Sequence, residues 1–217
     1  MSETVVTYHR DDLEKEKPMD RVEFYKEQVA AQKTGQQPTH VIGIVNIFLF
    51  NSRGELLIQK RSFEKAHNPG MLDKSMGGHI RFGDSADYSV MVETVQELQT
   101  PSIVLPNIAY FTKTLELLRE YLGTIAIVEH VQTKLYILEK IIEGTKIPVA
   151  NKTYTYFGLY DGRVRPADQE AKGVLFYTLP ELDKEMQKFP ETFTPDLHVF
   201  MKDLRKEMEA FLQMIKK

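Results

Sequence analysis

The chain has 217 residues, of which 42% are hydrophobic and 27% are charged, and this ordinary globular composition excludes wholesale disorder and fibrous repeats. The net charge of -3 offers no general attraction to nucleic acid or to an anionic membrane, although a small phosphorylated ligand remains compatible with it. Because the chain contains no cysteine, disulfides, thiolate zinc sites and cysteine nucleophiles are excluded.

The N-terminal region shows no targeting or membrane-spanning pattern. It carries neither an apolar run near 18 residues nor a basic segment followed by a short apolar stretch, and these are the patterns of membrane spans and signal peptides. We therefore expect a cytoplasmic protein, and at this length a single core.

The first predicted elements form an N-terminal arm and a hairpin. Residues 5–8 favour a short strand, and residues 20–32 favour a helix that presents Val22, Tyr25 and Val29 on one face. Residues 40–50 are rich in Val and Ile, and a short turn separates them from the apolar residues 56–58. This pattern predicts a β-hairpin.

The rest of the chain alternates between helical and strand patterns. A Gly- and Pro-rich loop precedes a predicted helix at residues 84–99, which Asp84 or Ser85 would cap. Residues 106–144 contain two helical patterns, and they are predicted to form a helical insertion whose apolar stripes would cover the cleft or a second copy of the chain. Strands are predicted at residues 154–160 and 173–179, followed by a helix that begins at Thr194 and Pro195. The pattern as a whole predicts a mixed α/β fold.

The helix at residues 84–99 carries two acids four residues apart, Glu93 and Glu97. Residues at this spacing share a helix face, so we expect both carboxylates to face outward, with Met91, Val95 and Leu98 on the inward side. No Lys or Arg occurs between Arg81 and Lys113 to offset their repulsion, whereas a hard divalent cation would do so. The alternative is that both are solvated surface charges.

The segment GHIRFGDSADYSVMVETVQELQT, residues 78–100, resembles the Nudix box, G-x5-E-x7-R-E-U-x-E-E-x-G-U with U an aliphatic residue. Gly78, Glu93 and Glu97 match the box, and Asp84 replaces its early glutamate conservatively. The departures from the box are Val92, Thr94, Gln96 and Gln99. The segments LLIQKRS, PGMLDKSMGGHI, YFGLYDG and EAKGVLFYTLPEL extend the similarity beyond it.

The resemblance implies a fold and a set of site residues. The expected fold is a Nudix α/β/α sandwich with a mixed sheet at residues 40–217, with an N-terminal arm at 1–39 and the helical insertion at 106–144. Glu93, Glu97 and Gln96 would hold Mg²⁺ or Mn²⁺, although the glutamine brings no charge and accepts no proton as a base. The remaining residues implied at the site are a further catalytic acid, Glu170, and three that would contact the substrate, Arg61, Gly78 and His79.

Three functions compete. The leading hypothesis is metal-dependent hydrolysis of a diphosphate linkage in a nucleoside diphosphate joined to another group, with no nucleic acid or membrane partner. The alternative is a catalytically silent Nudix domain that binds a ligand or a partner. The segment SMGGHI also resembles the isopentenyl-diphosphate isomerase branch, which uses a cysteine two residues before the histidine. Because Gly77 occupies that position, isomerase chemistry is disfavoured.

Overall fold

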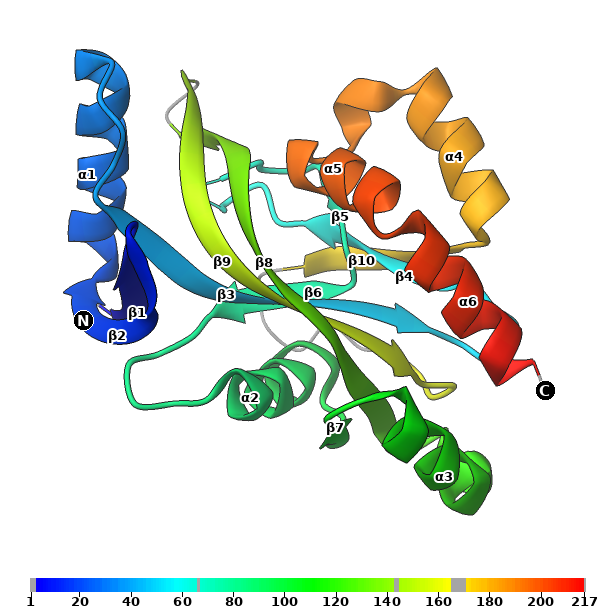
Figure 1. The fold of residues 1–217 in the computed structure, drawn as a ribbon. Coiled ribbons are helices and arrows are strands. Elements are labelled where there is room, and N and C mark those ends of the chain that lie inside the picture. The colour runs from blue at the N-terminus through cyan, green and yellow to red at the C-terminus, as the bar shows by residue number, and fades with distance from the viewer. Residues whose placement is uncertain (1–2, 66, 143–144, 165–170, 217) are drawn as a thin grey trace.

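A computed structural model describes residues 3–65, 67–142, 145–164 and 171–216 (Figure 1). The elements follow in the order β1 (Thr4–His9), β2 (Asp12–Asp20), α1 (Arg21–Thr34), β3 (His40–Phe50), β4 (Leu56–Arg61), β5 (Leu72–Asp73), β6 (Met76–His79), α2 (Ala86–Leu98), β7 (Ser102–Leu105), α3 (Ile108–Leu118), η1 (Arg119–Tyr121), β8 (Ala126–Ile142), β9 (Thr145–Leu159), β10 (Ala171–Tyr177), α4 (Leu179–Lys188), η2 (Pro190–Thr192), α5 (Pro195–Asp203) and α6 (Arg205–Ile215). Among the described residues, no helix has the length and apolarity needed to cross a membrane.

A single mixed sheet of ten strands organises the described part of the chain, with the central order β10-β4-β3-β9-β8-β7. Strand β3 runs parallel to β9, and β9 runs antiparallel to the long strand β8. The N-terminal strand β1 pairs with β3 and carries β2 on its other side, so the arm extends the same sheet. Strand β6 also pairs with β3, which places the loop before α2 beside the central strand.

Helices cover both faces of this sheet, and the alternation of β3 explains how. Phe48 and Phe50 belong to the apolar cluster that contains α5 and α6, whereas Val45, Ile47 and Leu49 belong to the cluster that contains α2. Alternate residues of a strand point to opposite faces, so a fully apolar strand needs cover on both sides. Figure 1 shows α2 on one side of the sheet and α5 with α6 on the other. The predicted α/β/α sandwich with a mixed sheet is confirmed.

The second half of the predicted helical insertion is wrong. The first helix exists as α3, but the second pattern lies in β8, which pairs with β9 along its length. Tyr136 and Leu138 are buried while Leu135 and Ile137 are exposed, which is the two-residue alternation of a strand. Apolar residues at neighbouring positions satisfied the helical template as well, and the pairing with β9 decided between the two periods.

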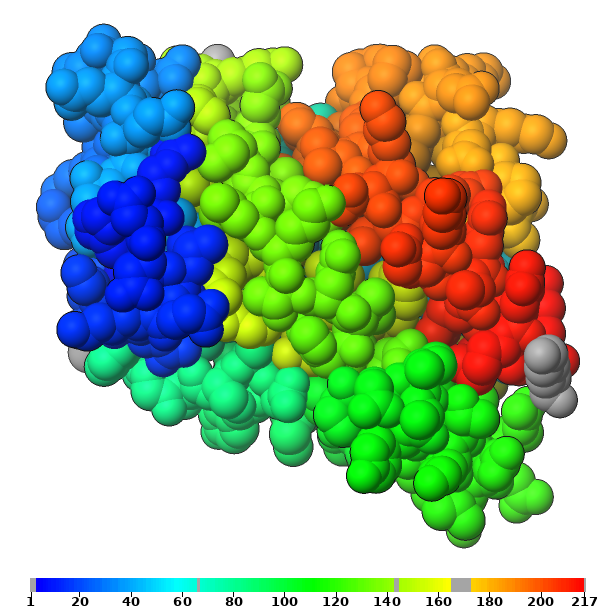
Figure 2. All heavy atoms as spheres, in the orientation of Figure 1, coloured from blue at the N-terminus to red at the C-terminus, as the bar shows by residue number. Residues whose placement is uncertain are grey.

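The predicted arm is confirmed in its strand and its helix, and of the three residues predicted to share a face, Tyr25 and Val29 pack against the apolar cluster that contains Phe24. Helix α1 buries Phe24, Gln28 and Ala31, while Val22 is exposed. Gln28 donates to the His40 carbonyl and accepts from the Ala150 amide, so a polar side chain fixes the helix on the sheet. In Figure 2 the N-terminal arm lies against the β8–β9 hairpin, and the C-terminal helices lie on the hairpin's other side.

The C-terminal helix begins where the sequence predicts, because Thr194 caps α5 by accepting from the Leu197 amide. It is interrupted at Leu204, so two helices stand in place of one. The sequence reading missed β2, β5, β6, β7 and α4. Helix α4 nevertheless carries a recognisable start, a capping box between Thr178 and Glu181 with a proline in the first turn.

Candidate functional site

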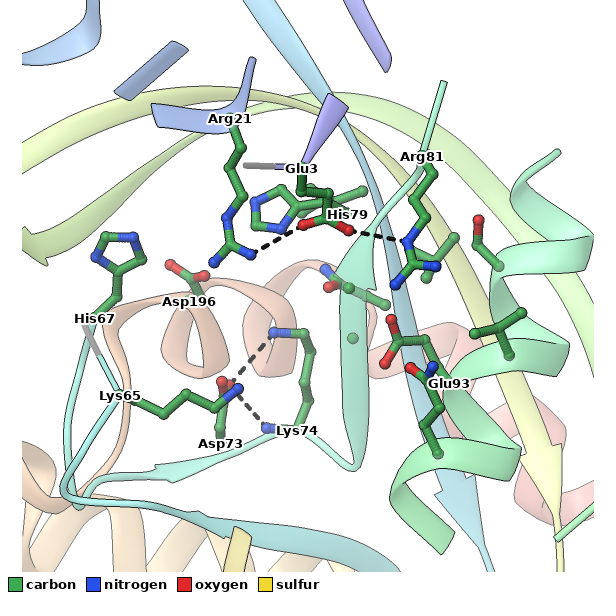
Figure 3. A pocket seen from close by; sticks show the side chains of 18 of the residues that line it. Glu3, Arg21, Lys65, His67, Asp73, Lys74, His79, Arg81, Glu93 and Asp196 are labelled. Atoms are coloured by element: carbon green, nitrogen blue, oxygen red, sulfur yellow. Dashed lines mark hydrogen bonds and ion pairs between the residues drawn. The ribbon is translucent and has the colours of Figure 1, made fainter. Parts of the chain in front are cut away.

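A cavity of about 570 Å³ opens between the arm, the central strand and the glutamate-bearing helix α2. Its lining comes from β1, α1, β3, the loop between β4 and β5, β6 and α2, and it is completed by Lys140 of β8 and Asp196 of α5. Figure 3 shows charged side chains converging on it from these elements. Its described cationic side chains are Arg21, Arg61, Lys65, Lys74, Arg81 and Lys140, and its described acids are Glu3, Asp73, Asp84, Glu93 and Asp196.

The orientation predicted for α2 is largely wrong. Met91 and Val95 are 44% and 52% exposed, whereas Glu97 is only 4% exposed. The buried stripe of the helix is Val90, Thr94, Glu97 and Leu98, which keeps helical spacing but includes a threonine and an acid. Because the stripe was expected to be wholly apolar, hydrophobicity alone selected the wrong side of the helix, and only Leu98 was placed correctly.

Burial of the Glu97 carboxylate is tolerated because a polar side chain donates a hydrogen bond to it. Gln59 of β4 donates to Glu97 Oε2 at 2.8 Å, so the carboxylate is tied to the sheet rather than solvated. The reading of Glu97 as a solvated surface charge is therefore wrong. Ser85, and not Asp84, caps the helix by accepting from the Tyr88 amide.

Gly78 of β6 lies directly against Glu93. A Cβ added at Gly78 would lie 1.8 Å from Glu93 Oε1, so any other residue would force the carboxylate away. The first glycine of the box thus leaves room for the first glutamate of the helix. Sequence reasoning paired these two residues only through the resemblance, and the structure supplies the steric reason for the pairing.

The oxygen donors on α2 are of the kind that Mg²⁺ prefers. Glu93 and Gln96 line the cavity, and Glu97 lies one helical turn after Glu93. Within residues 3–65, 67–142, 145–164 and 171–216, no cluster of three His, Asp or Glu side chains is arranged to hold a metal ion. The donor set therefore suits a cation that takes its remaining ligands from water and from a phosphate. Glu170 lies outside the described residues.

Arg61 reaches the cavity but is engaged by the protein. It donates from Nη1 to Asp73 Oδ2 at 3.1 Å, and from Nε and Nη2 to the His67 carbonyl at 3.2 and 2.9 Å. Lys74 Nζ lies 3.5 Å from Asp73 Oδ1, and Thr194 donates to the same oxygen at 2.9 Å. Burial alone would raise the pKa of Asp73, but Lys74 and Arg61 lower it to about 2. Sequence reasoning missed this cluster, and contact of Arg61 with a diphosphate stays a prediction.

His79 sits at the junction of the arm and the sandwich. Its Nε2 lies 3.0 Å from the hydroxyl of Tyr25 on α1, and Lys140 donates to that hydroxyl at 3.5 Å. Burial, and then the charge of Lys140, hold the pKa of His79 well below its ordinary value. The imidazole is therefore neutral near pH 7 and can take part in hydrogen bonds but not in charge pairing.

Glu3 brings the start of the described chain into the cavity. Its carboxylate receives hydrogen bonds of 3.1 Å from both Arg21 and Arg81, which Figure 3 shows as a bridge between the two arginines. The arm is therefore a structural part of the cavity wall.

The surroundings of Gly77 leave no space for a cysteine side chain at this position. A Cβ added there would lie 2.8 Å from the Val45 carbonyl oxygen and 3.0 Å from both Asn46 Oδ1 and Lys74 Cε. Real Cβ atoms essentially never approach backbone oxygen so closely. The side chain that the isomerase reaction would need has no room in this arrangement.

No family model matches the chain. The chain is 28% identical over 172 residues to the isopentenyl-diphosphate Delta-isomerase of Serratia proteamaculans, covering 78% of this chain and 80% of that protein. It is 42% identical over 55 residues to an uncharacterized Nudix hydrolase of Nostoc and 39% identical over 57 residues to a Nudix hydrolase of Deinococcus radiodurans. These two matches cover 25% and 26% of this chain and span about a third of those proteins, 32% and 33%.

Among solved structures, the chain is similar to DR0079 from Deinococcus radiodurans. The TM-score is 0.54 at 18% identity, and the match covers 75% of this chain and 82% of that one. At this identity the likeness concerns the fold alone.

Proposed function

We propose that this chain, which has the fold of the Nudix superfamily and sequence relatives within it, hydrolyses a diphosphate linkage in a nucleoside diphosphate joined to another group, with Mg²⁺ or Mn²⁺. The observation that carries the proposal is the placement of α2. Its glutamate Glu93 faces a cavity lined by six Lys and Arg side chains of the described residues, which suits a polyanionic ligand.

Glu93 and Glu97 would hold the divalent ion, with the amide oxygen of Gln96 as a neutral donor. A bound ion supplies neutralisation of the phosphate charge and an activated water. Gln59 orients Glu97 through its 2.8 Å hydrogen bond, and Gly78 leaves space for Glu93. The remaining donors of Arg61 and the ammonium of Lys140 would orient the phosphates, and neutral His79 would donate or accept a hydrogen bond there.

Glu170 is proposed as the general base, because Gln96 accepts no proton. The substrate would be a small phosphorylated molecule in the cytoplasm, without nucleic acid or membrane as a partner. A homodimer remains a prediction, and the exposed side chains of Ile108 and Leu117 on α3 offer apolar surface for it.

The test is hydrolysis of a panel of nucleoside diphosphate derivatives with Mg²⁺ or Mn²⁺, followed by ³¹P NMR. Glu97→Gln should lower kcat by about a hundredfold or more, as loss of a metal ligand, or of a group that orients one, commonly does. The glutamine can still accept from Gln59, so the fold should survive the change. Glu116→Gln on the exposed face of α3 is the matched control and should keep the wild-type rate. Equal rates for wild type and Glu97→Gln would contradict the proposal.

A silent ligand-binding domain is the second candidate, and one observation favours it. The described residues contain no three-membered cluster of metal-ligating side chains, and Gln96 and Val92 stand where the box has a glutamate and an arginine. Titration with Mg²⁺ by calorimetry separates the two proposals. Binding that Glu93→Ala abolishes would support the hydrolase, whereas saturable nucleotide binding with no metal binding and no turnover would support the silent domain.

A further inference from the structure

Asp196 and Asn46 line the cavity, and each carries a buried polar atom that has no hydrogen-bond partner among the described residues. Asp196 is 6% exposed and its Oδ1 receives no donor, and Asn46 is 1% exposed and its Nδ2 meets no acceptor. Both residues line the cavity beside the acidic helix. More than nine in ten buried polar groups in proteins are paired, so two unpaired atoms in the lining of one cavity require an explanation.

The local structure holds Asp196 in this position. It occupies the first turn of α5, after the cap Thr194 and the proline that follows it. A carboxylate in the first turn interacts favourably with the helix N-terminus. The same Thr194 side chain donates to Asp73, so the start of α5 is anchored to the floor of the cavity. Figure 3 shows the Asp196 carboxylate extending toward the space between His67 and Arg21.

The three cations whose charges act on Asp196 form hydrogen bonds or ion pairs elsewhere. Lys74 and Arg61 bind Asp73, and Lys140 donates to the Tyr25 hydroxyl. Asp196 therefore remains an acceptor that faces the cavity. Burial raises its pKa, and Lys140 and Lys74 oppose this increase only in part.

Asn46 lines the cavity from the central strand β3. Alternate residues of β3 share a face, so Asn46 stands in line with Ile44 and Phe48, between the apolar cluster under α1 and the cluster under α5. Its Oδ1 faces Gly77, and its Nδ2 is the unpaired donor. An amide at this point interrupts an otherwise apolar stripe, which costs stability unless a ligand pairs with it.

We propose that Asp196 and Asn46 are specificity residues that hydrogen-bond a hydroxyl-bearing group attached to the diphosphate, so that the cavity selects it over an apolar group of equal length. The inference rests on the proposed function for the presence of the diphosphate. A sugar hydroxyl can donate to the Asp196 carboxylate and accept from the Asn46 amide. An alkyl or isoprenoid group would bury the carboxylate and the amide without a hydrogen-bond partner. Sites built to pair a hydroxyl reject analogues that lack it far more strongly than apolar pockets reject a missing methylene.

The experiment compares two probes with the same nucleotide and the same number of carbons in the linked group, ADP-ribose and the pentyl ester of ADP. Binding is measured by calorimetry without added metal, so that turnover does not consume the ligand. The wild type should prefer ADP-ribose by about tenfold or more. Asp196→Ala should remove most of that preference, while Asp196→Asn, which keeps an acceptor oxygen, should retain it.

Asp84→Ala is the matched control, because it removes the same charge from the same cavity. Loss of an acid strengthens binding of any anion, so Asp84→Ala should raise both affinities and leave their ratio unchanged. Asn46→Val, which suits a strand, should lower the preference by about threefold and carries the test if Asp196→Ala does not fold. Equal wild-type affinities for the two probes, or an unchanged ratio in both Asp196→Ala and Asn46→Val, would overturn the inference. A clear preference without hydrolysis of any substrate would overturn the proposed function and support this inference.

Discussion

Asp73 and Asp196 face the same cavity and are both buried, yet the fold treats them in opposite ways. Lys74, Arg61 and Thr194 surround Asp73 and lower its pKa to about 2. Burial dominates at Asp196 and raises its pKa, and one of its oxygens has no donor within the described residues. A carboxylate whose oxygens are paired with donors of its own protein supports the fold. A carboxylate with an unpaired oxygen in a cavity wall can instead accept a hydrogen bond from a ligand.

Glu129 on β8 extends the comparison to an acid that does not line the cavity. It is buried, and none of the described Lys, Arg or His residues forms an ion pair with it. Burial alone raises its pKa from 4.5 to about 7. Neighbouring donors and cations thus offset the cost of burial fully at Asp73 and in part at Asp196, and no charge offsets it at Glu129.

The largest expected effect on the free energy of unfolding is at Asp73. Asp73→Ala should lower the free energy of unfolding at pH 7 by about 3 to 5 kcal/mol, because Arg61 and Lys74 would remain buried without their counter-charge. Urea unfolding measures the change, with Glu116→Ala on the exposed face of α3 as a control within about 0.5 kcal/mol of wild type. A loss below about 1 kcal/mol would show that Asp73 is not structural and would remove the contrast with Asp196.

The pH dependence of the same variant gives a second readout. The pKa of Asp73 is about 2 in the fold and 3.8 ordinarily, so its contribution is fully present above pH 3.8. It is lost as the pH falls through 2, where the folded carboxylate takes up its proton. The difference between wild type and Asp73→Ala should therefore narrow in acid and stay constant from pH 5 to 8.

The sequence was most informative where function and local pattern coincide. The spacing of Gly78, Glu93 and Glu97 located the acidic helix, and the strand β3 was predicted with its observed bounds. Neither Asp73 nor Asp196 was singled out, because only the fold brings these two acids into the lining of one cavity. Thr194 meets Asp73 across 121 positions, and no local period encodes such a contact.

The errors have a common physical cause, since tertiary contacts overruled a local hydrophobic pattern. On α2 a hydrogen bond from Gln59 buries Glu97, and the apolar residues Met91 and Val95 face outward instead. In β8 the apolar positions fit a helix and a strand almost equally, and pairing with β9 selected the strand. Periodicity counts apolar residues, but it does not identify the polar partner that makes burial of an acid tolerable.

A smaller effect is expected at Glu129. Glu129→Gln should raise the free energy of unfolding at pH 8 by about 1 to 2 kcal/mol, because the buried carboxylate is ionised there at a cost that a neutral amide avoids. The pKa is raised in the fold, so the cost begins as the pH rises above 4.5 and is complete above about 7. Urea unfolding at pH 4.5 and pH 8 tests the sign. A gain of equal size at both pH values would mean that ionisation of Glu129 is not the cause.

The smallest expected effect, and the one that decides the comparison, is at Asp196. Burial raises the pKa of the Asp196 carboxyl, so removing its charge in Asp196→Asn stabilises the fold. The same change also removes a favourable interaction with the start of α5, worth about 0.3 to 1 kcal/mol. The free energy of unfolding at pH 7 should therefore change by between zero and a gain of about 1 kcal/mol, and the gain should vanish below pH 3.8. The same substitution at Asp73 should destabilise the fold, so the two variants should differ in sign. A loss above about 1 kcal/mol at Asp196 would make it a second structural acid. A neutral or stabilising result, together with the loss of probe selectivity in Asp196→Ala, would mean that the fold retains this carboxylate at its own expense, as proteins do at sites kept for a ligand.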